Sequence, residues 1–180
     1  MEKEIVQALK ILQDGGVILY PTDTIWGLGC DATNPDAIQK IYNIKKRKES
    51  KALITLVSDK KMLKKLTDFI PKIDITSEPT TVIYQNIHRL SDNLLAEDGT
   101  AAIRIVQDNF CKQLIEIFGK SIVSTSANIS GTNSPKQFSD INDDIINNAD
   151  YIVNLRKNER RENSSRILKI EKNGSITKLR

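Results

Sequence analysis

The sequence is poor in the side chains that covalent and metal-dependent catalysis require. Its 180 residues include one histidine, His88, and two cysteines, Cys30 and Cys111. A zinc site needs about four Cys or His ligands in a spaced motif, which these three residues do not supply. We therefore expect no metal held directly by protein ligands and no Ser-His-Asp triad built on His88. Isolated thiols suit a reducing compartment, which predicts a cytoplasmic location.

Three common signatures of phosphate and acyl chemistry are also missing. The chain has no Gly-x-x-x-x-Gly-Lys-Ser/Thr phosphate loop, no Gly-x-Gly-x-x-Gly dinucleotide fingerprint and no Gly-x-Ser-x-Gly nucleophile elbow. These absences disfavour covalent catalysis by a protein nucleophile. Phosphate chemistry that depends on charge neutralisation and positioning stays open.

Long apolar runs and aromatic clusters are lacking too. No apolar stretch approaches the roughly 20 residues that a membrane helix needs, and the first residues open directly into an amphipathic pattern without a signal-peptide block. We expect no membrane partner. Aromatic residues make up 5% of the chain and do not cluster, which argues against a stacking platform for single-stranded RNA.

What remains is the composition of one globular domain spanning residues 1–180, with 39% hydrophobic and 28% charged residues. The net charge of +4 is unevenly placed, because five of the seven residues in 45–51 are basic, and residues 156–180 hold nine basic against three acidic side chains. Such clusters favour polyanionic partners, either nucleotide phosphates or RNA, although a solvated basic face explains them equally well.

Hydrophobic periodicity predicts an α/β fold with a mixed sheet. Apolar spacing predicts a first helix over residues 5–12, and Asn34 with Pro35 marks the start of a second helix. Further helices are predicted over 60–66, 110–118 and 141–147. Strands are predicted over 17–20, 52–57, 80–84, 101–105, 122–125 and 151–154, and residues 22–31 are expected to form a loop. The Asn-Gly pair at 173–174 predicts a closing hairpin between 166–170 and 175–179.

Three stretches carry side chains suited to ligand binding. The first, residues 20–30, follows a strand that ends in Pro21 and offers the hydroxyls of Thr22 and Thr24 beside glycines that allow close backbone approach. A polar turn over a buried Trp26 is the competing interpretation.

The second stretch is the basic run at the end of the second helix. If the chain is extended there, Lys45 and Arg47 point to one side and Lys46 to the other, so that two cations converge on a polyphosphate. Lys51 follows nearby. Cations that merely complement the helix dipole are an equally good explanation.

The third stretch, residues 124–131, places four hydroxyls and one amide directly after a strand. These groups can bind phosphate oxygens, the water shell of a metal or a substrate amino group. A hydroxyl-rich cap for the next element is the alternative.

Taken together, the three stretches resemble the YrdC-like (TsaC-type) L-threonylcarbamoyladenylate synthases. They match, in order and spacing, the family pattern Tyr-Pro-Thr-(Asp/Glu)-Thr-x-(Tyr)-Gly-Leu-Gly, then Lys-x-Arg, then Ser-x-Asn, and the resemblance covers residues 5–180. Trp26 stands where many members have tyrosine. The resemblance implies a twisted mixed sheet with flanking helices around a large basic cavity.

The resemblance also implies an activity. Family enzymes are nucleotidyltransferases that combine L-threonine, bicarbonate and ATP, with Mg²⁺, into threonylcarbamoyl-AMP and pyrophosphate. A transfer complex then passes the threonylcarbamoyl group to adenosine 37 of tRNA. By position, the catalytic residues implied are Lys45, Arg47, Ser126 and Asn128. The other ATP contacts implied are Lys51, Thr100, Ser134 and Arg180. The threonine contacts implied are Thr22, Thr24, Arg104, Ser124 and Ser165.

Two other functions compete with this one. The same fold can serve as a non-catalytic module that binds RNA directly, including double-stranded RNA, or the ribosome, through its basic surface. The third possibility is carbamoyl chemistry like that of the hydrogenase-maturation relatives, which carry this domain in much longer chains.

Overall fold

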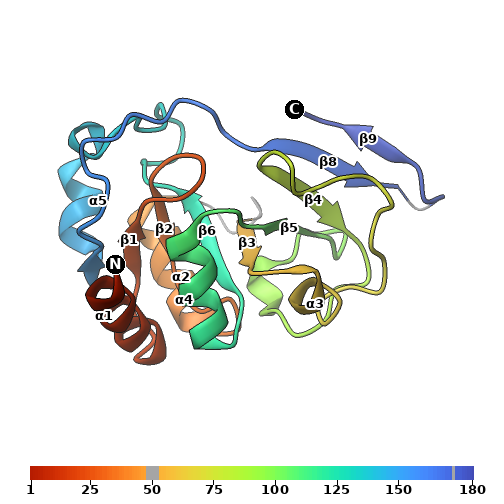
Figure 1. The fold of residues 1–180 in the computed structure, drawn as a ribbon, viewed down its shortest axis with the longest axis horizontal. Coiled ribbons are helices and arrows are strands. Elements are labelled where there is room, and N and C mark those ends of the chain that lie inside the picture. The colour runs from red at the N-terminus through yellow and green to blue at the C-terminus, as the bar shows by residue number, and fades with distance from the viewer. Residues whose placement is uncertain (48–52, 172) are drawn as a thin grey trace.

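The computed structural model describes residues 1–47, 53–171 and 173–180. In these ranges the chain forms a mixed nine-stranded sheet in the order β7-β1-β2-β6-β3-β5-β4-β8-β9 (Figure 1). The strands are β1 (Ile18–Tyr20), β2 (Gly27–Gly29), β3 (Ile54–Val57), β4 (Thr80–Tyr84), β5 (Ala101–Ile105), β6 (Ile122–Ser126), β7 (Tyr151–Ile152), β8 (Arg166–Ile170) and β9 (Ile176–Lys178). The predicted α/β class with a mixed sheet is confirmed.

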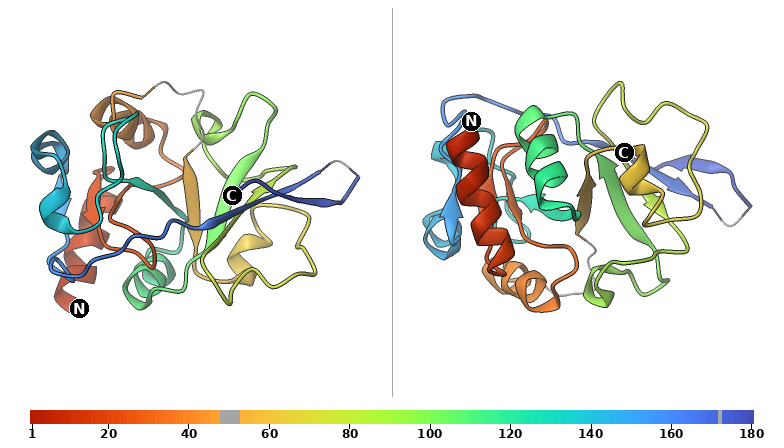
Figure 2. Two further views of the ribbon diagram at one scale, coloured as in Figure 1. Left: turned by 90° about the horizontal axis from the view of Figure 1, so that it is seen from above. Right: turned by 60° about the horizontal axis from the view of Figure 1, so that its bottom comes forward.

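Helices cover the half of the sheet that contains β1, β2 and β6. They are α1 (Glu2–Gln13), α2 (Pro35–Ile44), α4 (Asn109–Phe118) and α5 (Asp143–Asn148). The short helix α3 (Lys60–Leu63) instead contacts β3 and β5, and 3-10 turns lie at Asp92–Leu94 and Phe138–Asp140. Helices α1 and α4 lie side by side, and α2 lies on the opposite face (Figures 1 and 2). The longest described helix, α1, has 12 residues, and none of the described helices has the length and apolarity to cross a membrane.

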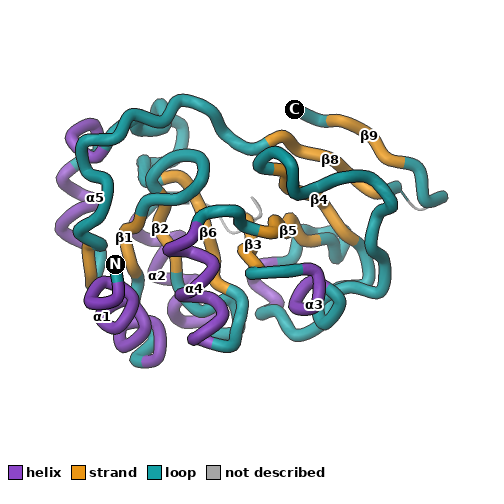
Figure 3. Tube along the Cα trace, viewed as in Figure 1, coloured by secondary structure: helices purple, strands orange, loops and turns teal. Residues whose placement is uncertain are grey.

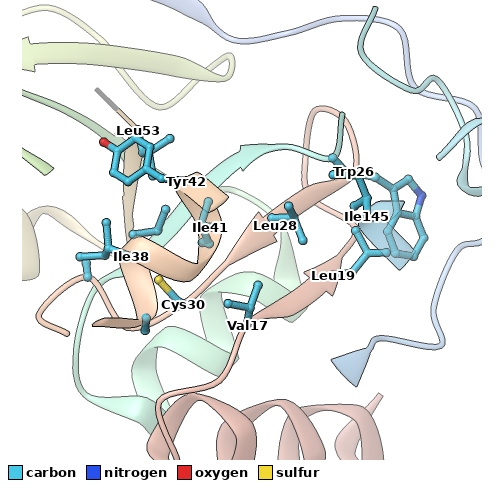
Figure 4. Packing of buried hydrophobic residues seen from close by; sticks show 14 of the residues in the cluster. Val17, Leu19, Trp26, Leu28, Cys30, Ile38, Ile41, Tyr42, Leu53 and Ile145 are labelled. Atoms are coloured by element: carbon cyan, nitrogen blue, oxygen red, sulfur yellow. The ribbon is translucent and has the colours of Figure 1, made fainter. Parts of the chain in front are cut away.

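Alternation along β1 explains why both faces of the sheet are covered. Val17 and Leu19 pack into the cluster on the α2 face, which Figure 4 shows, whereas Ile18 and Tyr20 pack against α1 and α4. Successive side chains of a strand point to opposite faces, so a strand that is apolar at every position needs a helix on each side. The run 17–20 therefore specifies a central strand buried on both faces.

Local signals in the sequence set the boundaries of α2. The Oδ1 atom of Asn34 accepts hydrogen bonds from the backbone N–H groups of Asp36 and Ala37, at 3.0 and 3.1 Å. Pro35 occupies the first helical position, as predicted. The closing hairpin is also confirmed, with β8 antiparallel to β9 and a positive φ of 82° at Gly174.

The prediction of a loop over 22–31 is wrong at Gly27–Gly29, which forms β2 between β1 and β6. Two glycines in three residues resemble a turn, but here they allow close approach of neighbouring strands. A Cβ added to Gly29 would lie 2.5 Å from the Val123 carbonyl oxygen and 2.6 Å from the Tyr20 ring. Other predicted boundaries differ by a few residues, as at α3, α5, β3 and β7.

We expect Gly29→Ala to destabilise the protein by about 1–3 kcal/mol, because the added methyl group overpacks the interface of β2 with β1 and β6. Urea unfolding monitored by circular dichroism measures this change. Gly119→Ala is the comparator. Its φ of 73° is also unfavourable for alanine, but nothing lies within 4 Å of the added Cβ, so its cost is limited to about 1 kcal/mol of backbone strain. Equal losses in the two variants would contradict the packing explanation.

A long connection links the two ends of the sheet. Residues 153–165 run as a loop from β7, beside α5, to β8 (Figure 3). Arg156 in this connection forms an ion pair with Asp108 and donates a hydrogen bond to the Pro21 carbonyl oxygen at 3.2 Å. The connection therefore holds the start of the loop between β1 and β2.

Candidate functional site

A cavity of about 360 Å³ lies where the middle strands of the sheet meet three loops. Ligand pockets are typically about 300–1,000 Å³, so the volume is sufficient for a small-molecule site. Three arginines line it, Arg47, Arg104 and Arg180, and no Asp or Glu is among its described lining residues. The cavity is therefore suited to anionic ligands.

The loop between β1 and β2 supplies one wall. Thr24, Ile25 and Trp26 line the cavity, whereas Thr22 does not. The Thr22 hydroxyl donates a hydrogen bond to the Ile25 carbonyl oxygen at 2.8 Å and accepts one from the Thr24 N–H at 3.0 Å. Thr22 thus fixes the conformation of the loop, and Thr24 lines the cavity.

Arg104, on β5, is held in place by the same loop. Its Nη2 atom lies 3.0 Å from Asp23 Oδ1, and both side chains are almost fully buried, with 3% and 9% exposed. Arg104 Nη1 also donates to the Thr24 hydroxyl at 3.3 Å. Within the described part of the chain, Arg104 Nε has no hydrogen-bond partner. Arg104 lines the cavity, and a guanidinium in such a position can bind a carboxylate.

Strands β4 and β8 and the residue Arg180 form the opposite wall. The hydroxyls of Thr81 and Ser165 lie 2.7 Å apart, and both residues line the cavity. Arg180 donates from Nε and Nη2 to the Ser165 carbonyl oxygen, at 3.1 and 3.0 Å. The Arg180 guanidinium is therefore anchored to β8 at the cavity.

The basic run after α2 does not have the predicted extended conformation. Lys45 is in the right-handed helical region, and Lys46 has a positive φ of 50°. The exposed Lys46 side chain turns away and pairs with Asp144 at 3.0 Å. Arg47 lines the cavity, and partial burial lowers the pKa of its guanidinium from the ordinary value. The helical conformation thus extends to Lys45, and the chain turns at Lys46. As a result, the three basic side chains have different surroundings.

Lys45 is buried, with 1% of the residue exposed, and is not among the residues that line the cavity. Its ammonium donates to the Ser126 carbonyl oxygen, to the Asn128 carbonyl oxygen at 2.7 Å and to Asn128 Oδ1 at 3.4 Å. Burial, with a smaller contribution from the Arg47 charge, lowers the pKa of Lys45 to about 7. The two predicted cations therefore have different surroundings.

The structure brings most of the residues implied by the sequence to one cavity. Those that line it are Thr24, Arg47, Arg104, Ser124, Ser126, Ser134, Ser165 and Arg180. Those that do not line it are Thr22, Lys45, Thr100 and Asn128. Lys51 lies outside the described residues.

Thr100 has a local structural partner instead of facing the cavity. Its hydroxyl donates to Asp98 Oδ1 at 2.6 Å, and its N–H donates to the same oxygen at 3.1 Å. The pair closes the turn before β5, in which Gly99 has a positive φ of 75°. The hydroxyl of Thr100 thus serves the turn in this structure.

Two residues of the site were not singled out from the sequence. Asp23 lies within the first stretch, but its pairing with Arg104, 81 positions further along the chain, carried no local signal. Thr81 lines the cavity from the start of β4. The two adjacent threonines that begin this strand, ahead of Val82 and Ile83, were the signal available for it.

The described residues contain no group of three or more His, Cys, Asp or Glu side chains placed to hold a metal ion. The described lining of the cavity offers arginine cations, hydroxyls and backbone groups. Such groups bind and position anions and stabilise developing negative charge.

Known proteins share the sequence pattern of this chain. The Sua5/YciO/YrdC family model, described as "Telomere recombination", matches residues 10–180. A threonylcarbamoyl-AMP synthase of Vibrio parahaemolyticus is 34% identical over 136 residues, which is 69% of this chain and 72% of the relative.

Solved structures have the same fold. P. abyssi Sua5 complexed with L-threonine superposes with a TM-score of 0.84 at 22% identity, covering 100% of this chain and 54% of that one. E. coli YciO gives a TM-score of 0.85 at 21% identity, covering 100% of this chain and 89% of that one.

Proposed function

The chain belongs to the Sua5/YciO/YrdC family, and from that premise we propose that it is a threonylcarbamoyl-AMP synthase. It combines L-threonine, bicarbonate and ATP into threonylcarbamoyl-AMP and pyrophosphate. The observation that carries the proposal is one cavity whose described lining includes Arg104 and Thr24 as well as Arg47 and Ser126. The same cavity thus offers groups suited to an amino acid and groups suited to a triphosphate.

Arg104 is proposed to bind the carboxylate of threonine. It is buried, held by Asp23 and Thr24, and retains a donor that is unused in the described structure. Thr24, Ser124 and Ser165 also line the cavity, and their hydroxyls are proposed to bond the hydroxyl or amino group of the substrate. The L-threonine held by P. abyssi Sua5, which has the same fold, supports an amino acid as the ligand.

Arg47, Ser126, Ser134 and Arg180 are proposed to bind ATP. Arginine offers a planar fork that matches phosphate oxygens, and hydroxyls complete the contacts. Lys51 and Thr100 remain predictions as nucleotide contacts. Mg²⁺ is proposed to enter with ATP, held by phosphate oxygens and water, because no carboxylate lines the described cavity.

The reaction then needs positioning more than a protein nucleophile. Bicarbonate condenses with the amine of threonine, water leaves, and a carbamate forms. A carbamate oxygen attacks the α-phosphorus of ATP, the bond from that phosphorus to the bridging oxygen breaks, and pyrophosphate leaves. Arg47 and the hydroxyls stabilise charge on the transferring and leaving phosphates. A separate transfer complex is proposed to pass the threonylcarbamoyl group to tRNA.

Incubation of the purified chain with ATP, Mg²⁺, bicarbonate and L-threonine tests the proposal. We expect pyrophosphate release that requires both threonine and bicarbonate, at least tenfold above reactions with L-serine or without an amino acid, and a product with the mass of threonylcarbamoyl-AMP. Chelation by EDTA should abolish the release. Salt-sensitive binding to double-stranded RNA without any pyrophosphate release would favour the non-catalytic module instead.

A further inference from the structure

We infer that Lys45 is a positioning residue for Ser126, and that its ammonium holds the loop after β6 instead of contacting the phosphates of ATP. The inference rests on the proposed function. It distinguishes residues that contact the phosphates from residues that hold the neighbouring loop in place. Arg47 and Ser126 line the cavity, whereas Lys45 and Asn128 do not. Lys45 and Asn128 are proposed to fix the shape of the wall that Ser126 and Ser134 present.

The hydrogen bonds of Lys45 support this assignment. An ammonium has three donors, and three oxygens lie within hydrogen-bond distance of Lys45 Nζ, two of them carbonyls. The carbonyl oxygen of Lys45 in turn accepts a hydrogen bond from the Ser130 N–H at 2.9 Å. The end of α2 and the loop after β6 are thus joined through both the side chain and the backbone of one residue.

Asn128 completes the same unit. Its Nδ2 group donates to the carbonyl oxygens of Ile129, at 3.1 Å, and Thr132, at 2.7 Å. Both donors of the amide are therefore used within the loop, and its oxygen faces Lys45. Removing the ammonium would leave the Ser126 and Asn128 carbonyl groups without this donor and would release the loop whose ends, Ser126 and Ser134, lie at the cavity.

Amine labelling of the unmodified protein gives the first test, and it does not depend on activity. Acetic anhydride at pH 8, with and without ATP, is followed by peptide mass spectrometry. We expect Lys45 to react at least tenfold more slowly than exposed Lys60 in both conditions. Its lowered pKa would make Lys45 the more reactive amine if it were accessible. Rapid labelling that ATP suppresses would overturn the inference, because it would place the amine in the nucleotide site.

The second test uses Lys45→Met, with Lys40→Met as the matched control. Lys40 is also on α2 and donates to a backbone carbonyl, that of Gly15 at 3.1 Å, but it is exposed and does not line the cavity. In the ligand-free protein, Lys45→Met should raise amide hydrogen exchange at Ser130 and Thr132 at least tenfold over the control. Unchanged exchange there would contradict the positioning role.

Kinetics separate positioning from a phosphate contact and from a purely structural role. We expect Lys45→Met to lower kcat at least tenfold while KM for ATP stays within threefold, because Arg47 and Arg180 still line the cavity. Lys45→Arg should lose as much activity, since the larger guanidinium cannot fit the enclosed site. A tenfold rise in KM with kcat retained, an active Lys45→Arg, or unchanged kinetics with a lower melting temperature would each overturn the inference.

If the wild-type protein releases no pyrophosphate, only the proposed function fails. Amine labelling and hydrogen exchange would still decide the placement of Lys45.

Discussion

Arg47→Met is expected to lower the turnover of threonine-dependent pyrophosphate release by about 10²–10³-fold, the loss typical of removing one donor that stabilises charge in a transition state. Among the described residues of the basic run, Arg47 is the one that lines the cavity. Partial burial lowers the pKa of its guanidinium, and arginine side chains remain charged in proteins because the charge is delocalised over the guanidinium. Methionine keeps the length and the apolar stem but removes the charge. Steady-state release assays at saturating threonine and bicarbonate measure the effect.

Lys46→Met is the matched control, because it removes a neighbouring cation that points elsewhere. Lys46 pairs with Asp144 on the surface, an interaction of about 0–1 kcal/mol at most. We expect this variant to retain turnover within twofold of wild type, and both variants to keep the wild-type circular dichroism spectrum. Turnover of Arg47→Met within threefold of wild type would rule out a role for Arg47 in stabilising the phosphates. Equal losses in both variants would indicate a nonspecific effect of net charge.

The fold was largely predictable because its determinants are local. The apolar run 17–20, the Asn34 cap and the Asn-Gly turn act within a few residues, and each produced the expected element. Strand β2 was missed because its glycines reflect the closeness of Tyr20 and Val123, which the sequence alone does not reveal. A propensity that favours turns was overridden by packing between strands.

The sequence predicted individual residues of the site but not the contacts that those residues make. The hydroxyl-rich and basic stretches supplied Thr24, Arg47, Ser124 and Ser126 of the cavity lining. The family resemblance, not a local pattern, implied Arg104, Ser134, Ser165 and Arg180. The sequence did not reveal that Lys45 would be enclosed by carbonyl oxygens while Arg47 reached the cavity. That difference depends on the positive φ of Lys46, which reverses the chain where an extended conformation was expected.

Arg104→Met should combine loss of threonine dependence with a large loss of stability. The substitution removes the proposed partner of the substrate carboxylate, so KM for threonine should rise at least 100-fold. It also leaves the buried Asp23 carboxylate without its cation, and breaking a buried pair in this way costs about 3–5 kcal/mol. Urea unfolding measures the second effect independently of the first.

The double variant Arg104→Met/Asp23→Asn separates the two effects. Neutralising Asp23 removes the unpaired buried charge, while the asparagine oxygen can still accept the hydrogen bond that the Gln107 N–H donates to Asp23 Oδ2 at 3.1 Å. We expect the double variant to recover at least half of the lost stability and none of the threonine affinity. If affinity returned with stability, Arg104 would serve only the fold of the loop between β1 and β2. If Arg104→Met alone kept wild-type stability, the buried pair would contribute nothing, and the loop would be held by the hydrogen bonds of Thr22 and Arg156.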